Sequence, residues 1–345
     1  MHTHLTERSA AHRRRGSAAL RLSAISAISA ACVAASLAGT TPSAWAADAT
    51  APASDTTTAL APAAMPLLGS ADAAAQAVAY WTPARIAAAS VVGGQAPAST
   101  GTAERQDHAD EQDTADSGPI SVAQQVAPVS HIGRLFYNLN GQGYACSANV
   151  VEAANRSTVA TAGHCMTGNG AFATDSVLVP GYHDGGGDYG RWPVVGGYVA
   201  GGFTEDNGDA ADDVGFVVVA RNDDGDDIES VVGASPVLFD QSLTQEGSVY
   251  GYPAEGRFDG ESLQRCTGRF EETDPQAIDL PCDMTGGVSG GPIFAGDEAT
   301  GAQYAEEDAR YEDSSHIIGP IWQGNEHTAY DLAAAVDTES AAAQG

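Results

Sequence analysis

A serine among glycines is the first feature of this chain that could do chemistry. The segment Gly287–Pro292 reads GVSGGP. A serine hydroxyl is a weak nucleophile at neutral pH, so it needs a neighbouring base and donors for the negative oxygen that its attack creates. Glycines leave the backbone free to turn its N–H groups toward one point. The segment predicts Ser289 as a nucleophile, with the N–H groups of Gly287 and Ser289 as its oxyanion hole. The alternative is a glycine-rich hairpin turn without a catalytic role.

Two further segments could supply the base and its partner. His164 follows a β-branched run in Thr161–Cys165 (TAGHC), so it lies just past the end of a predicted strand. Asp213 directly precedes the apolar run 214–219. A carboxylate at the end of a buried strand is costly unless a partner such as an imidazole N–H accepts its charge. We therefore predict a triad of His164, Asp213 and Ser289, although either residue alone fits a structural histidine or a solvated acidic turn.

The order of the three residues along the chain, histidine, aspartate, serine, is that of chymotrypsin-like enzymes and not of subtilisins or α/β-hydrolases. From about Ile132 to its C-terminal end the chain resembles the trypsin/chymotrypsin-like serine peptidase family, and within it the secreted bacterial branch with glutamyl-endopeptidase-like members. The resemblance implies an all-β fold of two packed antiparallel six-stranded barrels with the triad between them. It also implies hydrolysis of peptide bonds through an acyl-enzyme intermediate, without a cofactor or metal.

The cysteines agree with an exported protein. Outside the first 46 residues they are Cys146, Cys165, Cys266 and Cys282. An even number suggests two disulfides, and counting alone leaves three pairings open. A zinc site is disfavoured because no CxxC pair is present. The family resemblance implies the pairs Cys146–Cys165 and Cys266–Cys282.

The beginning of the chain has the composition of an export signal. Arginines at 13–15 and 21 precede an apolar run, and Ser43–Ala46 offers a cleavage site, so we predict a signal peptide over residues 1–46 rather than a membrane anchor. Residues 47–125 are rich in Ala, Thr, Ser, Pro and Asp, which indicates a propeptide or disordered linker with one short helix across 71–89.

From residue 126 onward, short β-branched runs alternate with Gly, Asn and Asp clusters, as in antiparallel sandwiches and barrels. We assign 126–345 to a serine protease domain, with an N-terminal barrel at about 126–232, a C-terminal barrel at about 233–338 and a short helix at Tyr330–Val336. The predicted strands are Leu135–Asn138, Tyr144–Val151, Ser157–Ala160, Ser176–Val179, Val214–Ala220, Ser248–Tyr252, Pro292–Phe294 and Ile317–Trp322.

The charge pattern narrows the class of partner. The formal net charge is −30, and all 15 basic residues besides histidine are arginines. Such an acidic surface argues against nucleic acid or an anionic membrane as partner. We expect a secreted, extracellular monomer that acts on polypeptides, with its own propeptide as a possible further partner. The acidic stretch Asn222–Asp227 fits a solvated turn better than a calcium site, because the EF-hand spacing and closing glutamate are absent.

The residues that set specificity are harder to identify. The resemblance to trypsin-like members suggests Asp283 at the floor of the substrate pocket, while the glutamyl-specific members suggest Thr285, His316 or His327. We expect Ile318–Gln323 to pair with the substrate backbone. Trp322 would then form a pocket wall, or else it is a core residue.

The segment Ser90–Gly94 (SVVGG) is similar in sequence to the N-terminus of a mature trypsin-like enzyme. Val288 and not aspartate precedes Ser289, so the ion pair that such a start forms in trypsin-like enzymes is impossible here. We therefore do not expect activation at this position. Two other functions stay open, namely an esterase with the same triad and a catalytically silent binding protein on the same fold.

Overall fold

The computed structural model describes residues 60–91, 121–203, 210–241, 244–274, 276–311 and 313–338. All of them belong to one compact unit, Thr56–Gly345. The predicted signal peptide, together with residues 47–59 and 92–120 of the predicted propeptide, lies outside the described residues. In the part of the chain that the structure describes, no helix is long and apolar enough to cross a membrane.

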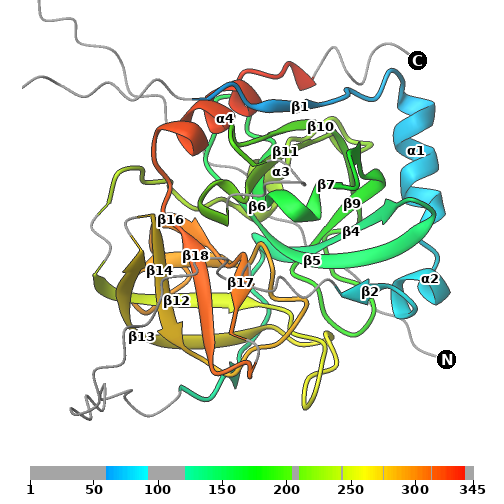
Figure 1. Ribbon diagram of the computed structural model, residues 1–345. Helices are drawn as coiled ribbons and strands as arrows, with labels where there is room; N and C mark the ends of the chain where they lie inside the picture. The colour runs from blue at the N-terminus through cyan, green and yellow to red at the C-terminus, as the bar shows by residue number, and fades with distance from the viewer. Residues whose placement is uncertain are drawn as a thin grey trace, which may run out of the picture. The chain divides into compact units, whose positions relative to one another are not determined.

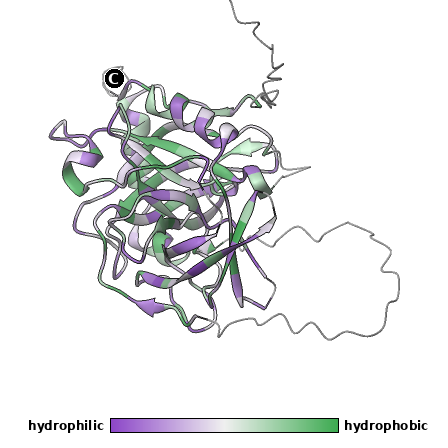
Figure 2. Cartoon of the chain, turned by 90° about the vertical axis from the view of Figure 1, so that its left-hand side faces the viewer, coloured by the Kyte–Doolittle hydropathy of each residue, from purple (hydrophilic) through white to green (hydrophobic). Residues whose placement is uncertain are grey.

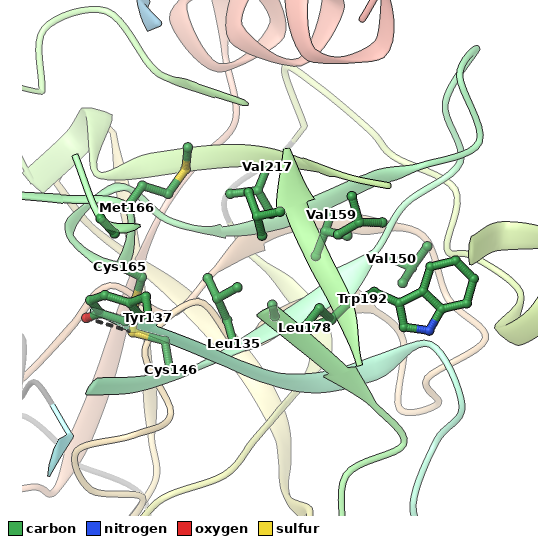
Figure 3. Close-up of a cluster of buried hydrophobic side chains, with 14 of the residues drawn as sticks. Leu135, Tyr137, Cys146, Val150, Val159, Cys165, Met166, Leu178, Trp192 and Val217 are labelled. Carbon is green, nitrogen blue, oxygen red and sulfur yellow. Dashed lines mark hydrogen bonds between the residues drawn. A yellow bond between two sulfur atoms is a disulfide. The ribbon is translucent and has the colours of Figure 1, made fainter. Parts of the chain in front are cut away.

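The first half of this unit is a closed antiparallel barrel. Its six strands lie in the order β10-β11-β6-β5-β4-β9, and β9 pairs with β10 to close the ring. Apolar side chains such as Leu135, Val159, Leu178 and Val217 point into its centre, with the Cys146–Cys165 disulfide beside them (Figure 3). The strands are β4 (Ile132–Leu139), β5 (Gln142–Val150), β6 (Thr158–Ala162), β9 (Thr174–Pro180), β10 (Trp192–Val199) and β11 (Val214–Val219).

The second half is an antiparallel sheet curled into a barrel, in the order β16-β15-β12-β13-β14-β18-β17. Its two ends approach each other at one bridge, between Ala305 and Ile321. Its core includes Val249, Phe270 and Ile293. The strands are β12 (Gln245–Gly251), β13 (Gln264–Asp274), β14 (Ala277–Pro281), β15 (Pro292–Ala295), β16 (Gln303–Glu306), β17 (Ala309–Arg310) and β18 (His316–Pro320), and β3 (Gln124–Gln125) pairs with β13. The predicted all-β fold of two packed barrels is confirmed.

The C-terminal helix α4 (Gly324–Ala334) packs on β10 and β11 of the first barrel (Figure 1). It begins earlier than the predicted Tyr330, because Gln323 and Glu326 form a capping box that satisfies its first N–H groups. Its position explains why every residue of β11 is buried: Val217 and Val219 face the barrel core, and Phe216 and Val218 lie under the helix. The described chain also contains the helix α3 (Ile228–Val232), the short turns η1 (Gly163–Cys165) and η2 (Ala210–Asp212), and the small pair β7 (Thr167–Gly168) and β8 (Ala171–Phe172).

Residues 60–91 wrap around the first barrel as an ordered strap (Figure 1). They form β1 (Ala63–Met65), α1 (Ala71–Tyr80), α2 (Pro83–Ala87) and β2 (Ser90–Val91). Strand β1 pairs with β10, and β2 pairs with β5. Trp81 is fully buried against Phe136, and its indole N–H donates to the carbonyl of Asp175 at 2.6 Å. A disordered linker is therefore the wrong description of residues 60–91.

The single helix predicted across 71–89 is also wrong, because two helices meet at Thr82-Pro83. A residue before proline avoids the helical region, whereas proline fits the first position of a new helix. Thr82 accordingly has ψ 160° and caps α2 by accepting from the N–H of Arg85. Across the whole unit, helices and strands carry both hydrophilic and hydrophobic stretches (Figure 2), as expected for elements that bury one face.

Candidate active site

Ser289 lies in the turn between β14 and β15, and the neighbouring glycines are required by its shape. Gly287 has φ +101°, a left-handed conformation that residues with a side chain rarely adopt. A Cβ atom on Gly287 would also lie 2.6 Å from the carbonyl oxygen of Tyr252, closer than non-bonded atoms can approach. The glycine-rich pattern in the sequence therefore reflects a backbone that only glycine can follow.

Ser147 of β5 holds the carbonyl side of this turn. Its hydroxyl donates to the carbonyl of Gly287 at 2.8 Å, and its backbone N–H donates to the carbonyl of Ser289 at 2.8 Å. The N–H of Tyr252 donates to the same hydroxyl at 2.9 Å. Among the described residues, no acceptor takes a hydrogen bond from the N–H of either Gly287 or Ser289. The turn thus leaves both amides available, as an oxyanion hole needs.

His164 and Asp213 are brought together by the pairing of β6 with β11. Their strands are antiparallel neighbours, with Val214 opposite Ala162, so the end of one lies beside the start of the other. Asp213 accepts two hydrogen bonds from His164. Its Oδ1 accepts from the backbone N–H at 2.7 Å, and its Oδ2 lies 2.8 Å from the ring Nδ1. Gly163 permits this approach, since a Cβ atom there would lie 2.9 Å from Asp213 Oδ1.

The environment of His164 makes its ring more basic than an isolated imidazole. Burial lowers its pKa, but the charge and hydrogen bond of Asp213 outweigh burial, so the pKa lies above the ordinary 6.5. The charge of Glu307 acts in the same direction, and that of Arg310 opposes it. Asp213 therefore both orients the ring and stabilises its protonated form, which are the two tasks of the carboxylate in a triad.

The histidine and serine loops adjoin each other. The Sγ atom of Cys165, the residue after His164, lies 3.9 Å from the carbonyl oxygen of Ser289. His164 Nε2 and Ser289 Oγ are both buried, and neither has a hydrogen-bond partner among the described residues. Both atoms therefore lie in neighbouring loops without a partner that would occupy them. Hydrogen bonds between catalytic groups are often long in the absence of substrate and shorten when it binds.

The comparisons with known proteins agree with this geometry. No protein-family model and no curated protein matches the sequence. Among solved structures, the chain is similar to the protease Anisep from Arthrobacter nicotinovorans, with 39% identity over 62% of this chain and 100% of that one, at TM-score 0.59. The chain belongs to the chymotrypsin-like serine proteases. A second relative is the thermostable serine protease AL20 from an extremophilic microorganism. It is 38% identical to this serine protease, the alignment covers 60% of this chain and 97% of AL20, and the TM-score is 0.56. A Glu endopeptidase, 19% identical over 64% of this chain and 99% of that one at TM-score 0.52, shares the fold.

The two disulfides of this serine protease join Cys146 to Cys165 and Cys266 to Cys282, the pairs that the family resemblance implies. The first ties the loop of His164 to β5. Cys146, His164 and Cys165 are also the one group of described side chains spaced as metal ligands. Because the two cysteines are joined to each other, they cannot act as the thiolate ligands that such a site needs.

The residues predicted to line the substrate pocket are dispersed. Asp283 forms an ion pair with Arg257 at 2.9 Å and accepts from the N–H of Ala123, so its charge is already engaged. Thr285 exchanges two hydrogen bonds with the backbone of Glu255 and anchors that loop beside the nucleophile turn.

The other three side chains lie elsewhere. His316 pairs with Asp279 at 3.2 Å on β14, and His327 stacks on Phe239. Trp322 is a fully buried core residue, not a pocket wall. It packs on Phe216 and donates to Glu306 at 2.5 Å. Ile318–Gln323 also differs from its predicted role, since β18 ends at Pro320 and pairs with β14 and β17.

A run of buried carboxyl groups beside the candidate triad was not predicted from the sequence. Glu306, Glu307 and Asp308 follow each other at the end of β16, and none exposes more than 2% of its surface. The signal that could have found them is the acidic triplet itself, 17 to 19 residues after Ser289. Three adjacent carboxyl groups usually indicate a solvated loop, which is why sequence reasoning passed over them.

Proposed function

We propose that this chain is the precursor of a secreted serine endopeptidase whose triad is His164, Asp213 and Ser289. The observation that carries the proposal is the His164 ring, held 2.8 Å from the Asp213 carboxylate in a loop that adjoins the glycine turn of Ser289. The 39% identity to Anisep, which is named a protease, supports the same reaction class.

The reaction is acyl transfer in two halves. Ser289 Oγ attacks the carbonyl carbon of the peptide bond, and His164 Nε2 takes the hydroxyl proton while Asp213 holds the Nδ1–H. The N–H groups of Gly287 and Ser289 donate to the oxyanion of the tetrahedral intermediate. The intermediate collapses when His164 returns the proton to the leaving amine, which leaves the acyl group on Ser289. Water then attacks the ester by the same path and restores the hydroxyl.

Residues 60–91 act as the ordered part of a propeptide that lies beside this site. Ser90 and Val91 pair with Tyr144 and Ala145 of β5 in parallel, directly before Cys146. Val91 also lies next to the oxyanion turn, since a Cβ atom added to Gly287 would come within 3.0 Å of its Cγ1. For the rest of the chain, we assign residues 1–46 to the signal peptide and residues 126–345 to the catalytic domain. The disulfides fit export, since they persist in oxidising compartments.

The test is the variant Ser289→Ala together with labelling by a serine-directed phosphonate. The variant should lose both peptide hydrolysis and labelling, while Ser230→Ala, a serine on α3, should keep both. Normal hydrolysis by Ser289→Ala would contradict the assignment. Hydrolysis of an ester but not of the matching amide by the unchanged enzyme would favour the esterase alternative.

A further inference from the structure

Glu307 is held next to the nucleophile by its backbone. Its N–H donates to the carbonyl of Gly291 at 2.9 Å, and its carbonyl accepts from the N–H of Gly290 at 2.6 Å. These two hydrogen bonds continue the pairing of β15 with β16, in which Pro292 lies opposite Glu306. Glu307 is therefore fixed in register with the turn that presents Ser289.

The carboxyl group of Glu307 lacks the partners that a buried acid normally has. The residue is fully buried, and within the described chain neither carboxyl oxygen has a hydrogen-bond partner of regular geometry. Burial raises the pKa to about 8, although Arg310, His164 and the Ser289 hydroxyl each act to lower it. The carboxyl group is therefore within electrostatic reach of both His164 and Ser289.

An unpartnered carboxyl at this depth is unfavourable for folding alone. Leaving a buried polar group without a hydrogen bond costs roughly 1–3 kcal/mol, and more if it is charged. The neighbouring Glu306 has a donor in the Trp322 indole. Glu307 has no such donor, although its backbone is hydrogen-bonded to the turn that presents Ser289. Buried groups of this kind next to reacting atoms mark functional sites.

We propose that Glu307 selects a lysine or arginine side chain on the acyl side of the bond to be cut, a proposal that rests on the proposed function. A cationic side chain supplies the donors and the charge that the Glu307 carboxyl lacks. An acidic side chain would meet Glu307 and the buried Asp308 next to it, and a neutral one would leave the carboxyl unpaired.

The other charged groups near the site favour the same substrate. Arg310 has one buried nitrogen, Nη1, without a hydrogen-bond partner among the described residues, but its charge is already paired, because Nη2 lies 3.2 Å from Glu255 Oε2. Asp283, the acid suggested by sequence, is engaged by Arg257 and is not free for this role. The net charge of −30 also attracts cationic peptides over longer distances.

The experiment uses the full chain as its producing cell processes it, with active sites counted by phosphonate titration. Peptide anilides that differ only in the residue before the cut, Arg, Lys, Leu or Glu, are compared by kcat/KM. We expect Arg and Lys to exceed Leu and Glu by about 10²-fold, the range seen when a buried charge gains its partner. Glu307→Gln should remove this preference and leave cleavage after Leu within a few-fold. Glu306→Gln is the matched control, because its amide oxygen can still accept from Trp322.

The outcomes are separable. The proposal would be overturned if the unchanged enzyme cut fastest after Glu or Leu. It would also be overturned if Glu307→Gln lowered kcat/KM equally on all four substrates, because that result would assign Glu307 to the triad. If Glu307→Gln does not fold, inhibition of the unchanged enzyme by an aryl amidine decides. Competitive inhibition that weakens as Arg substrate is added supports the cation site. Absence of inhibition contradicts the cation site. Absence of any phosphonate titration would instead refute the proposed function itself.

Discussion

Replacing Asp213 with asparagine tests the central contact of the site. Asp213 offers two acceptor oxygens to His164, one to the backbone N–H and one to the ring. Asparagine has only one. If its oxygen keeps the backbone N–H, its NH₂ group faces Nδ1, which must become an acceptor, so the ring proton moves to Nε2 and the base is lost. If the amide is reversed, the ring keeps its tautomer, but the backbone N–H of His164 loses its acceptor.

Both arrangements are unfavourable, and the first removes catalysis. Loss of the correct tautomer in a triad lowers kcat by about 10⁴-fold, which corresponds to about 5 kcal/mol of transition-state stabilisation. Loss of the backbone bond would lower the free energy of unfolding by about 1–3 kcal/mol. We therefore expect Asp213→Asn to fold, with kcat reduced by about four orders of magnitude.

The assay is hydrolysis of fluorophore-labelled casein, with thermal unfolding measured in parallel. The matched control is Asp212→Asn, because Asp212 is equally buried but accepts from Asn325 at 2.7 Å instead of from His164. It should stay within a few-fold of the unchanged enzyme. A folded Asp213→Asn variant within tenfold of the unchanged enzyme, or equal losses in both variants, would refute this account of the triad.

Because the raised pKa of His164 belongs to the base, kcat/KM should fall as pH is lowered through a value above 6.5, and a pH–rate profile with its midpoint below 6.5 would contradict this. Replacing Cys146 and Cys165 by serine opens a loop with sequence separation 19, so the free energy of unfolding in urea should fall by about 3 kcal/mol, and an unchanged value would disagree. Trp81→Ala should loosen the strap and speed phosphonate labelling of the uncut chain, with the exposed Val231→Ala as control and an unchanged rate as the contrary result. If the enzyme cuts after basic residues, self-processing should occur after Arg105, the one basic residue other than histidine between 92 and 133, and N-terminal sequencing should find Gln106.

The segments of the proposed triad could be recognised in the sequence because each combines a short motif with a strand end. His164 and Asp213 border runs of apolar residues, and Ser289 lies in a glycine pattern that its φ angles require. The fold class followed from the same alternation of short runs and turns. These are local features, so a single sequence contains them.

The remaining strands and the pocket depended on contacts that are distant in sequence. Strand β13 contains the charged residues Arg265, Arg269 and Glu271, whose side chains point outward. These charges interrupt the apolar pattern by which a strand is recognised in a sequence. Strand β16 ends in acids that are buried because Trp322 and the nucleophile turn lie against them. When residues far along the chain bury a carboxyl group, the sequence around that group shows no periodic pattern. Neither strand β16 nor the role of Glu307 could therefore be recognised from the sequence.

The ion pairs of the arginines also affect how readily such an enzyme would digest other molecules of itself. The chain contains no lysine, so arginine side chains would be the only points at which a protease selecting basic residues could digest itself. Several of them are tied down: Arg156 to Asp227 and Glu229, Arg257 to Asp283, and Arg310 to Glu255. A side chain held in this way is a poor substrate for a neighbouring molecule. The acidic surface would thus protect the mature enzyme against autolysis.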